Sequence, residues 1–143
     1  MTHLTLRLDW SEQDLYGHIN NVSYFKYQQA ARVNFWEAIG LTAQDGTEGL
    51  GPLLAAANMR FVLPLHYPGT VRLETEVSFL KNTSFGLHHR MYDEAGTLCA
   101  EGEDVVVAFD YSAGEKKLIP DSLRALLESH LGSSEATPAP RES

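Results

Sequence analysis

The first ten residues alternate between apolar and polar side chains. Leu4, Leu6, Leu8 and Trp10 share one face of an extended chain, and the residues between them are polar or charged. A period of two residues is typical of a strand with one buried face. The chain is therefore predicted to open with a half-buried β-strand.

A long segment rich in apolar residues, without glycine or proline, follows at residues 24–39. Gly40 stands directly after it, at the place where a residue of left-handed conformation commonly ends a helix. The segment is predicted to form a helix of about four turns. Because its apolar residues spread around most of the circumference, we expect this helix to be central and covered on more than one side.

Strand patterns dominate the second half of the chain, at residues 53–63, 71–79, 85–92 and 97–110. The second and third of these segments alternate between apolar and polar residues, which predicts long strands buried on one side. A tight turn at residues 93–96 joins two successive strands. The run of strands is therefore predicted to form an antiparallel meander.

The order of these elements predicts the fold class. A short helix is expected after Pro120, with leucines along one face and an end at Gly132. A strand, a long helix and a run of antiparallel strands indicate an α+β fold, in which one antiparallel sheet wraps around one long central helix. One domain is expected over residues 1–131, followed by a polar, disordered tail over residues 132–143. The glycine-rich segment 42–51 is expected to be a mobile connection.

Composition narrows the class of protein. Of the 143 residues, 43% are hydrophobic and 21% are charged, as in an average soluble globular protein. Eleven Lys and Arg against nineteen Asp and Glu give a formal net charge of −8. This charge opposes binding to a phosphate backbone, so no nucleic-acid partner is expected.

The cysteine count and the N-terminus bear on the compartment. Cys99 is the single cysteine of the sequence and cannot form a disulfide within the chain. The N-terminus lacks the basic stretch and apolar run of a signal peptide, and no segment reaches the ~20 apolar residues of a membrane span. We therefore expect a cytoplasmic protein with no membrane partner. His66, His88 and His89 do not form a metal-binding pattern with Cys99, so no metal is expected.

Residues 11–21, between the first strand and the long helix, hold two acids, a histidine, a glycine and two amides. One interpretation is structural, because Asn and Ser residues cap helices and glycine permits turns. The other is chemical. The N-terminus of a helix presents unpaired N–H groups that stabilise a developing oxyanion, and Asp14 lies a few residues away as a base or nucleophile. This arrangement suits acyl transfer.

The segment Asp14-Leu15-Tyr16-Gly17-His18-Ile19-Asn20-Asn21, followed by Tyr24, Tyr27 and Arg32, resembles a known family motif. It is similar to the opening of hotdog-fold acyl-CoA thioesterases of the 4-hydroxybenzoyl-CoA thioesterase type. The likeness in layout extends over roughly residues 4–130. The resemblance implies a hotdog fold and hydrolysis of an acyl-CoA thioester to the free acid and CoA, without a cofactor.

The resemblance also implies roles for individual residues. Asp14 matches the catalytic carboxylate, which acts as a general base toward water or as a nucleophile on the thioester carbonyl. The backbone N–H of Asn21 matches the donor to the thioester oxygen. His18, Asn20 and the Asn21 side chain either orient Asp14 or water, or serve as caps and turn residues; both interpretations stay open.

Three further residues complete the predicted site. Gly17 belongs to the turn of the motif, and Tyr24 and Tyr27 are expected to line an apolar tunnel for the acyl chain. The sequence departs from the commonest family pattern at Glu12, where many members have Asp, and at Ile19, where Val is usual. The change at Glu12 keeps the charge but moves it by a methylene, which leaves its contribution open.

Partners and alternatives follow from the same resemblance. The substrate is expected to be an acyl-CoA, with an acyl carrier protein thioester as a related option. The basic residues that could meet CoA phosphates are Arg60, Arg72, Lys81 and Arg90, although a solvated charge on a strand face is the better explanation for any single one of them. The expected assembly is a homodimer or homotetramer with shared active sites, in which residues 58–60 of a partner could contribute. The alternatives are a non-catalytic acyl-CoA-binding hotdog domain and a scaffold that only self-associates.

Overall fold

The computed structural model describes residues 1–41 and 49–132. The remaining parts of the expected mobile loop, 42–48, and of the expected tail, 133–143, lie outside the described residues. The elements in chain order are β1 (Thr2–Arg7), the 3-10 helix η1 (Trp10–Glu12), α1 (Asn21–Ala38), β2 (Leu50–Phe61), β3 (Thr70–Leu80), β4 (Ser84–Tyr92), β5 (Leu98–Asp110), β6 (Glu115–Lys116) and α2 (Asp121–Glu128).

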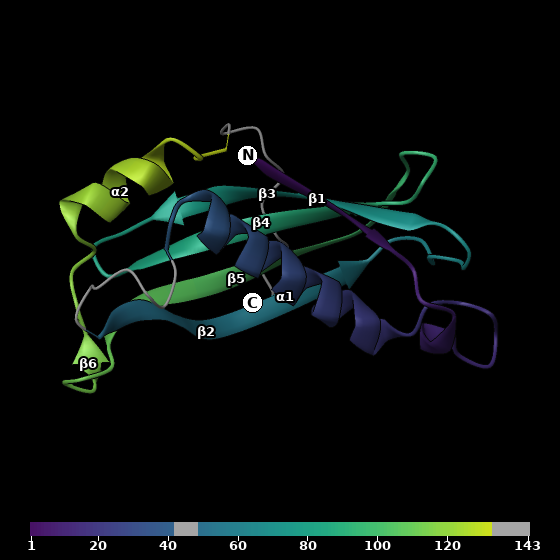
Figure 1. Cartoon of the computed structure of the whole chain (residues 1–143), viewed down its shortest axis with the longest axis horizontal. Helices are drawn as coiled ribbons and strands as arrows, with labels where there is room; N and C mark the ends of the chain where they lie inside the picture. Colours follow the sequence, from purple (N-terminus) through teal and green to yellow (C-terminus); the bar gives the residue numbers. More distant parts are fainter. Residues whose placement is uncertain (42–48, 133–143) are drawn as a thin grey trace.

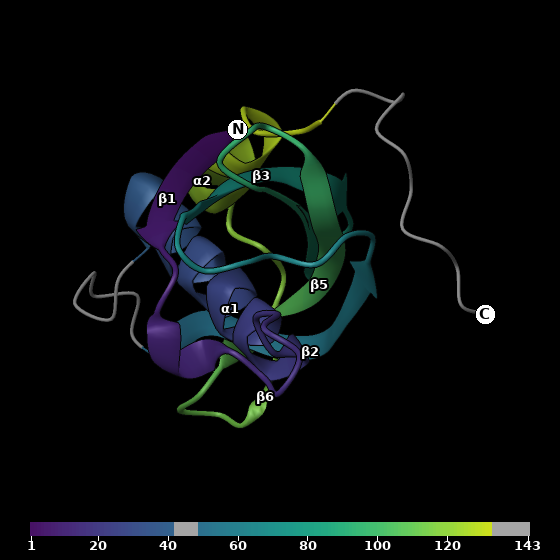
Figure 2. The same ribbon diagram turned by 90° about the vertical axis from the view of Figure 1, so that its right-hand side faces the viewer.

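One antiparallel sheet forms the body of the fold, with the strand order β1-β3-β4-β5-β2 and the short β6 beside β5. The strands β3, β4 and β5 follow one another as the predicted meander. The sheet curves around α1, which runs along its concave face, and α2 lies at the far end of the sheet from η1 (Figures 1 and 2). This arrangement confirms the predicted α+β fold with one sheet wrapped around one long helix.

The long helix α1 begins at Asn21, three residues earlier than the apolar pattern predicted, because Asn20 caps it. It ends before Gly40, whose φ of +78° is the left-handed conformation expected there. Tyr24, Tyr27, Ala31 and Phe35 are buried. Val22, Phe25 and Val33 are 70%, 41% and 44% exposed, so the expectation of cover on more than one side is wrong for the single chain. The sheet covers only one side of the helix, and apolar residues remain on the other.

The space between α1 and the sheet holds two apolar clusters. The first surrounds Tyr24 and Tyr27 near the start of α1, and the second surrounds Phe35 near its end. Burial of each large apolar side chain contributes about 1.5–3 kcal/mol to folding. These two clusters hold the helix along its length and fix the position of its N-terminus relative to the sheet.

A belt of buried polar side chains lies between the two clusters and joins α1 to three strands. Asp104 of β5 accepts hydrogen bonds from Gln28 (2.7 Å), Arg32 (3.0 Å) and His89 (2.7 Å). His89 in turn lies 2.8 Å from the hydroxyl of Thr75 on β3. Gly102 gives the belt its space, because a Cβ atom there would lie 2.4 Å from Oε1 of Gln28 and 2.3 Å from the carbonyl oxygen of Asn58.

The outer face of the sheet carries charged side chains that pair across strands. His88 donates to Glu101 (3.0 Å), and Arg90 donates to Glu76 (3.4 Å). Glu76, His88 and Glu101 are buried, and most other residues of β4 are buried as well. The prediction of one buried face was therefore wrong for β4, because alternation shows which residues are polar and not whether cross-strand pairing covers them.

β2 is an outer strand and differs from the others. It pairs with β5 along its whole length and has no strand on its other side within the described residues. Leu53, Leu54 and Phe61 are 38%, 42% and 49% exposed. An edge with exposed apolar residues invites pairing with another chain.

None of the described helices combines the length and the apolar character that crossing a membrane requires.

Candidate active site

The polar segment predicted to carry chemistry folds back on itself like a small hairpin. Asn20 N donates to the carbonyl oxygen of Glu12 (2.9 Å), Gln13 and Ile19 form an isolated β-bridge, and Asp14 N donates to the carbonyl oxygen of His18 (2.7 Å). The reversal needs a positive φ, which Gly17 supplies at +79°. We call residues 12–20 the Asp14 loop.

The Asp14 carboxylate sits at the closed end of this loop. Its Oδ1 accepts hydrogen bonds from the backbone N–H groups of Tyr16 (2.8 Å) and His18 (3.1 Å). These two backbone donors lower the pKa of Asp14, so the carboxylate is ionised at neutral pH. Oδ2 has no hydrogen-bond partner in residues 1–41 and 49–132, and the side chain is exposed. One oxygen is fixed and the other is available to a proton.

The start of α1 provides the second part of the site. The side chain of Asn20 caps the helix, with Oδ1 accepting from Ser23 N (2.9 Å) and Nδ2 donating to the carbonyl oxygen of Glu12 (2.9 Å). The first helical N–H, that of Asn21, has no acceptor within the described part of the chain. An unpaired N–H at the positive end of a helix attracts a developing negative charge.

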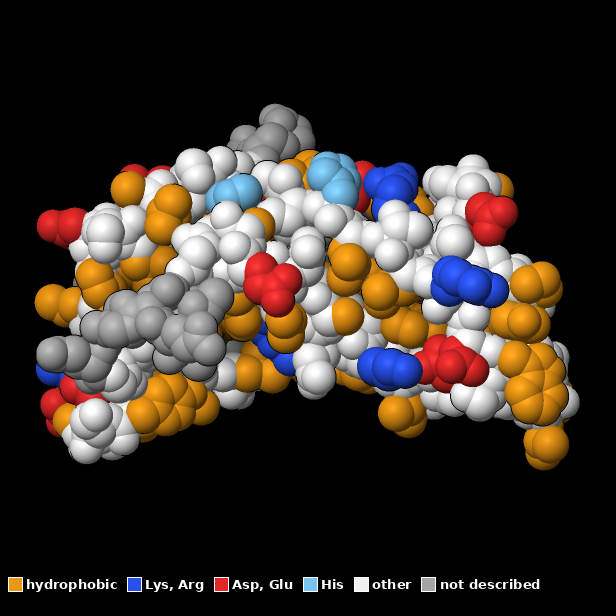
Figure 3. Space-filling view, viewed as in Figure 1, with side chains coloured by type: hydrophobic (Ala, Val, Ile, Leu, Met, Phe, Trp, Pro, Cys, Tyr) orange, Lys and Arg blue, Asp and Glu red, His pale blue; other side chains and the backbone are white. Residues whose placement is uncertain are grey.

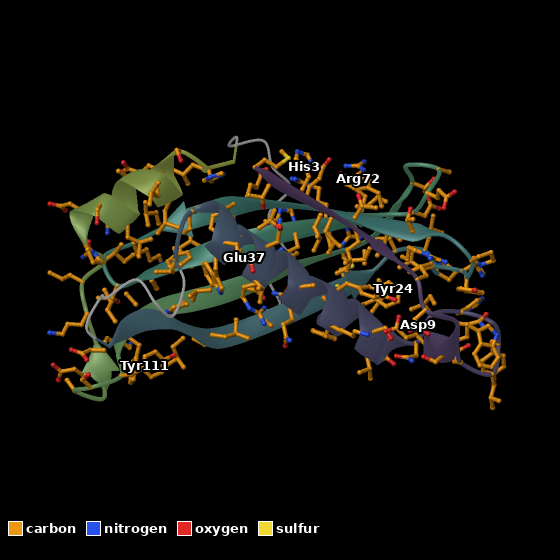
Figure 4. The ribbon with its side chains drawn as sticks, viewed as in Figure 1. His3, Asp9, Tyr24, Glu37, Arg72 and Tyr111 are labelled. Atoms are coloured by element: carbon orange, nitrogen blue, oxygen red, sulfur yellow. The ribbon has the colours of Figure 1, made fainter. Side chains whose placement is uncertain are left out.

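A groove of about 390 Å³ lies between the start of α1 and the end of β2. Its lining residues are Asp14, His18, Ile19, Asn21, Tyr24, Phe61, Val62, Leu63 and Pro64. Apolar side chains gather at this end of the molecule (Figure 3). Tyr24 lies on α1 close to Asp9, at the end of the molecule opposite Tyr111 (Figure 4). Its hydroxyl accepts from Leu65 N (2.9 Å), and its ring meets Phe61 edge to face at 5.1 Å.

The groove brings together four of the seven residues predicted for the site: Asp14, His18, Asn21 and Tyr24. Asn20 and Gly17 shape the loop and the helix start and are not among the lining residues. The buried Tyr27 also lies outside the lining, because its hydroxyl donates to Oε1 of Glu12 (2.6 Å).

Phe61 to Pro64 form the groove wall that sequence reasoning did not assign. They lie about 40 residues beyond the motif, and no local spacing connects the two segments. His66, next along this stretch, packs edge to face on His18, with ring centroids 4.9 Å apart.

The basic residues considered for CoA phosphates lie elsewhere. Arg60 pairs with Glu101, Arg72 with Glu74 and Arg90 with Glu76, while Lys81 lies over the ring of Phe79 at 5.3 Å. None of the four lines the groove.

The remaining reactive side chains in the described part of the chain form no second catalytic or metal-binding site. Cys99 is buried, and this burial raises the pKa of its thiol, which makes the thiol a poor nucleophile. Within residues 1–41 and 49–132, no three His, Cys, Asp or Glu side chains are placed to hold a metal ion. The groove therefore offers the carboxylate of Asp14, the free backbone N–H of Asn21, the imidazole of His18 and apolar walls.

Several known proteins are similar to this chain. The PA2801 protein of Pseudomonas aeruginosa is 28% identical, with a TM-score of 0.77 over 86% of this chain and 95% of that protein. The PA5185 protein of the same organism is 25% identical, with a TM-score of 0.82 over 93% of each chain. The gentisyl-coenzyme A thioesterase BH1999 is 24% identical, with a TM-score of 0.77 over 88% of this chain and 99% of that enzyme.

The similarity to known proteins extends over both the fold and the candidate site. These structural likenesses identify the sheet and its central helix as a hotdog fold. A profile of the thioesterase-like superfamily matches residues 8–127, which include the Asp14 loop, α1 and the groove wall of β2. The chain therefore belongs to the thioesterase-like superfamily.

Proposed function

We propose that the protein hydrolyses an acyl-CoA thioester and that Asp14 is its catalytic carboxylate. One observation carries this proposal: the free Oδ2 of Asp14 and the unpaired N–H of Asn21 belong to residues that line the same groove. Hydrolysis needs a base or nucleophile beside the carbonyl carbon and a donor beside the carbonyl oxygen. The name of the similar BH1999 protein, a gentisyl-coenzyme A thioesterase, supports a CoA thioester as substrate.

The geometry gives each residue a step. With Asp14 as general base, its carboxylate takes a proton from water as the water oxygen adds to the thioester carbonyl carbon. The negative charge that forms on the carbonyl oxygen is stabilised by the N–H of Asn21 and by the positive end of α1. Collapse of the intermediate breaks the C–S bond, and the thiolate of CoA leaves and takes up the proton. As a nucleophile, Asp14 would instead form a mixed anhydride that water then cleaves.

The groove also indicates where the substrate lies. Tyr24 and Phe61 form apolar walls beside the reactive groups, which suits an acyl group. No Lys or Arg lines the groove. We therefore expect the CoA phosphates to lie outside it, toward solvent.

The active assembly is proposed to be a homodimer or homotetramer with shared sites. β2 lies at the edge of the sheet with exposed apolar residues, and Phe61 to Pro64 at its end form one wall of the groove. A second copy paired along β2 would cover this edge and close the open side of each groove.

Thiol release from a panel of acyl-CoAs tests the activity. The panel runs from short to long aliphatic chains and includes phenylacetyl and benzoyl thioesters. We expect hydrolysis of at least one member and a loss of about 10²–10⁴-fold in kcat for Asp14→Asn, because the amide can neither accept the proton nor attack. KM should change little.

A matched control separates chemistry from folding. Asp110 accepts hydrogen bonds from the N–H groups of Ser112 and Ala113 in a similar turn at the other end of the sheet, so Asp110→Asn should keep full activity. A folded wild-type protein that binds an acyl-CoA tightly but hydrolyses no member of the panel would replace this proposal with the non-catalytic binding domain.

A further inference from the structure

Glu12, one of the two residues that depart from the commonest family pattern, has both carboxylate oxygens occupied. Oε1 accepts from the hydroxyl of Tyr27 (2.6 Å), and Oε2 accepts from Nζ of Lys26 (2.7 Å). The Glu12 side chain is only 11% exposed. Desolvation works to raise the pKa of Glu12, but the hydrogen bonds from Lys26 and Tyr27 outweigh it and lower the pKa. The carboxylate is therefore an anion held in place.

The backbone of Glu12 is bound as firmly as its side chain. Its carbonyl oxygen accepts from both N and Nδ2 of Asn20, each at 2.9 Å. Asn20 in turn caps α1 through Ser23. Glu12 is the first residue of the Asp14 loop. It connects the loop to the start of α1 through Asn20, and to the second turn of α1 through Lys26 and Tyr27.

We infer that Glu12 is a positioning residue, whose carboxylate holds the Asp14 loop against α1. In this position, the Asp14 carboxylate and the N–H of Asn21 contact the same thioester. Glu12 does not act on the substrate itself, because its oxygens are occupied and it is not among the groove-lining residues. This inference rests on the proposed function for its effect on rate. Its effect on the structure of the loop does not depend on that function.

Loss of this anchor has a specific consequence for Asp14. The two N–H groups that hold Oδ1 of Asp14, those of Tyr16 and His18, belong to the same loop. When the loop is released from α1, its own conformation is no longer held, so these hydrogen bonds are formed less often and the pKa of Asp14 rises toward the ordinary aspartate value. The distance between the carboxylate and the oxyanion donor changes at the same time, and a misplacement of ~1 Å costs roughly a hundredfold in rate.

Glu12→Ala tests the inference with two independent readouts. Steady-state hydrolysis should show kcat lowered by about tenfold to a hundredfold with KM nearly unchanged. An NMR titration of the Asp14 carboxyl carbon should show a higher pKa than in the wild type. Glu12→Gln keeps an oxygen that accepts from Tyr27 and should recover part of both properties. Asp110→Ala, which removes a turn carboxylate far from the site, should change neither readout.

Each result either supports or overturns the positioning role of Glu12. A folded Glu12→Ala protein with wild-type kcat and a wild-type Asp14 titration overturns the inference, and so does a rise in KM alone. If Glu12→Ala does not fold, Tyr27→Phe removes the same hydrogen bond from the helix side and should shift kcat and the Asp14 titration in the same directions. A wild-type protein without thioesterase activity would refute the proposed function, while the Asp14 titration would still decide the role of Glu12.

Discussion

At the scale of single residues, the proposed oxyanion donor is a backbone group, which a side-chain substitution does not remove. Asn21 occupies the first position of α1, and Asn20 before it has φ −70° and ψ 156°. Proline is favoured at the first helical position, and the residue before a proline prefers this extended conformation. The site therefore accepts a substitution that deletes one N–H and leaves the helix intact.

Asn21→Pro should lower kcat by about 10²–10³-fold, as loss of one oxyanion donor does in other enzymes. Asn21→Ala keeps the N–H and should retain nearly all activity, because the role requires no side chain. Steady-state hydrolysis of the best acyl-CoA measures both, and circular dichroism checks that α1 is intact. Equal activity in the two variants would show that the N–H does not contact the reacting oxygen.

The pKa of Asp14 predicts the pH dependence of the reaction. Hydrogen bonds from Tyr16 and His18 lower this pKa below its usual value of about 3.9. A base works only when it is unprotonated, so kcat/KM should fall on the acid side only below about pH 4. A pH-rate profile measures this, with circular dichroism at each pH to confirm folding. A decline centred above pH 5 in the folded protein would assign the essential base to another group.

The sequence could predict the motif side of the site but not the opposite wall. Asp14, His18 and Asn21 are close in sequence, and a carboxylate beside the start of a helix indicates acyl-transfer chemistry. Phe61 to Pro64 reach the groove only because β2 returns along the sheet to the start of α1. Tyr27 has a helical position that suits a tunnel wall, yet its hydroxyl binds Glu12, a long-range pairing that periodicity does not reveal.

At the scale of elements, the register of α1 on the sheet is fixed by the polar belt around Asp104. This carboxylate is fully buried and is bound by Gln28 and Arg32 from the helix and by His89 from β4. The apolar clusters are non-directional, whereas the belt allows only one alignment of helix and strands. A polar pair such as Gln28 and Arg32 within a largely apolar helix is the one signal of this belt that the sequence contains.

Asp104→Ala should reduce the free energy of unfolding by about 3–5 kcal/mol, because it leaves the largely buried Arg32 charge and the buried Gln28 amide unpaired. Urea denaturation at pH 7 measures the loss, and Glu37→Ala on the exposed side of α1 should cost little. Desolvation works to raise the pKa of Asp104, but hydrogen bonds and charges from His89 and Arg32 lower it overall.

The same pKa sets the pH range of this effect. A carboxylate with a lowered pKa in the folded state stabilises the protein fully above its unfolded pKa of about 3.9. The contribution is lost as the pH falls through the lower pKa of the folded state. The difference between wild type and Asp104→Ala should therefore shrink below about pH 4, and a constant difference down to pH 2 would contradict the assignment.

At the scale of the whole molecule, the sequence predicted the layers and their order but not which surfaces stay open. Alternation over 71–79 and 85–92 located strands correctly and misjudged the burial of β4, since hydrogen-bonded pairs such as His88 and Glu101 cover its outer face. The apolar circumference of α1 predicted cover on several sides, yet Val22 and Val33 are exposed in one chain. In the proposed homodimer or homotetramer, the exposed apolar residues of α1 and β2 form the surface that a second copy would cover.

Pairing along β2 predicts that assembly and activity are lost together. Leu53 and Leu54 are neighbours on the exposed strand, so their side chains point to opposite faces of the sheet edge. Replacing both by Glu places like charges from two copies beside each other without disturbing the core of one chain. Sedimentation should show the mass of two or four chains for the wild type and of one chain for this variant, with kcat/KM reduced because each groove loses its cover. Leu126→Glu on α2, at a residue that is 43% exposed and outside the sheet, should keep both assembly and activity. A fully active monomer would show that each chain builds a complete site, and the open side of the groove would then be the entrance for the substrate.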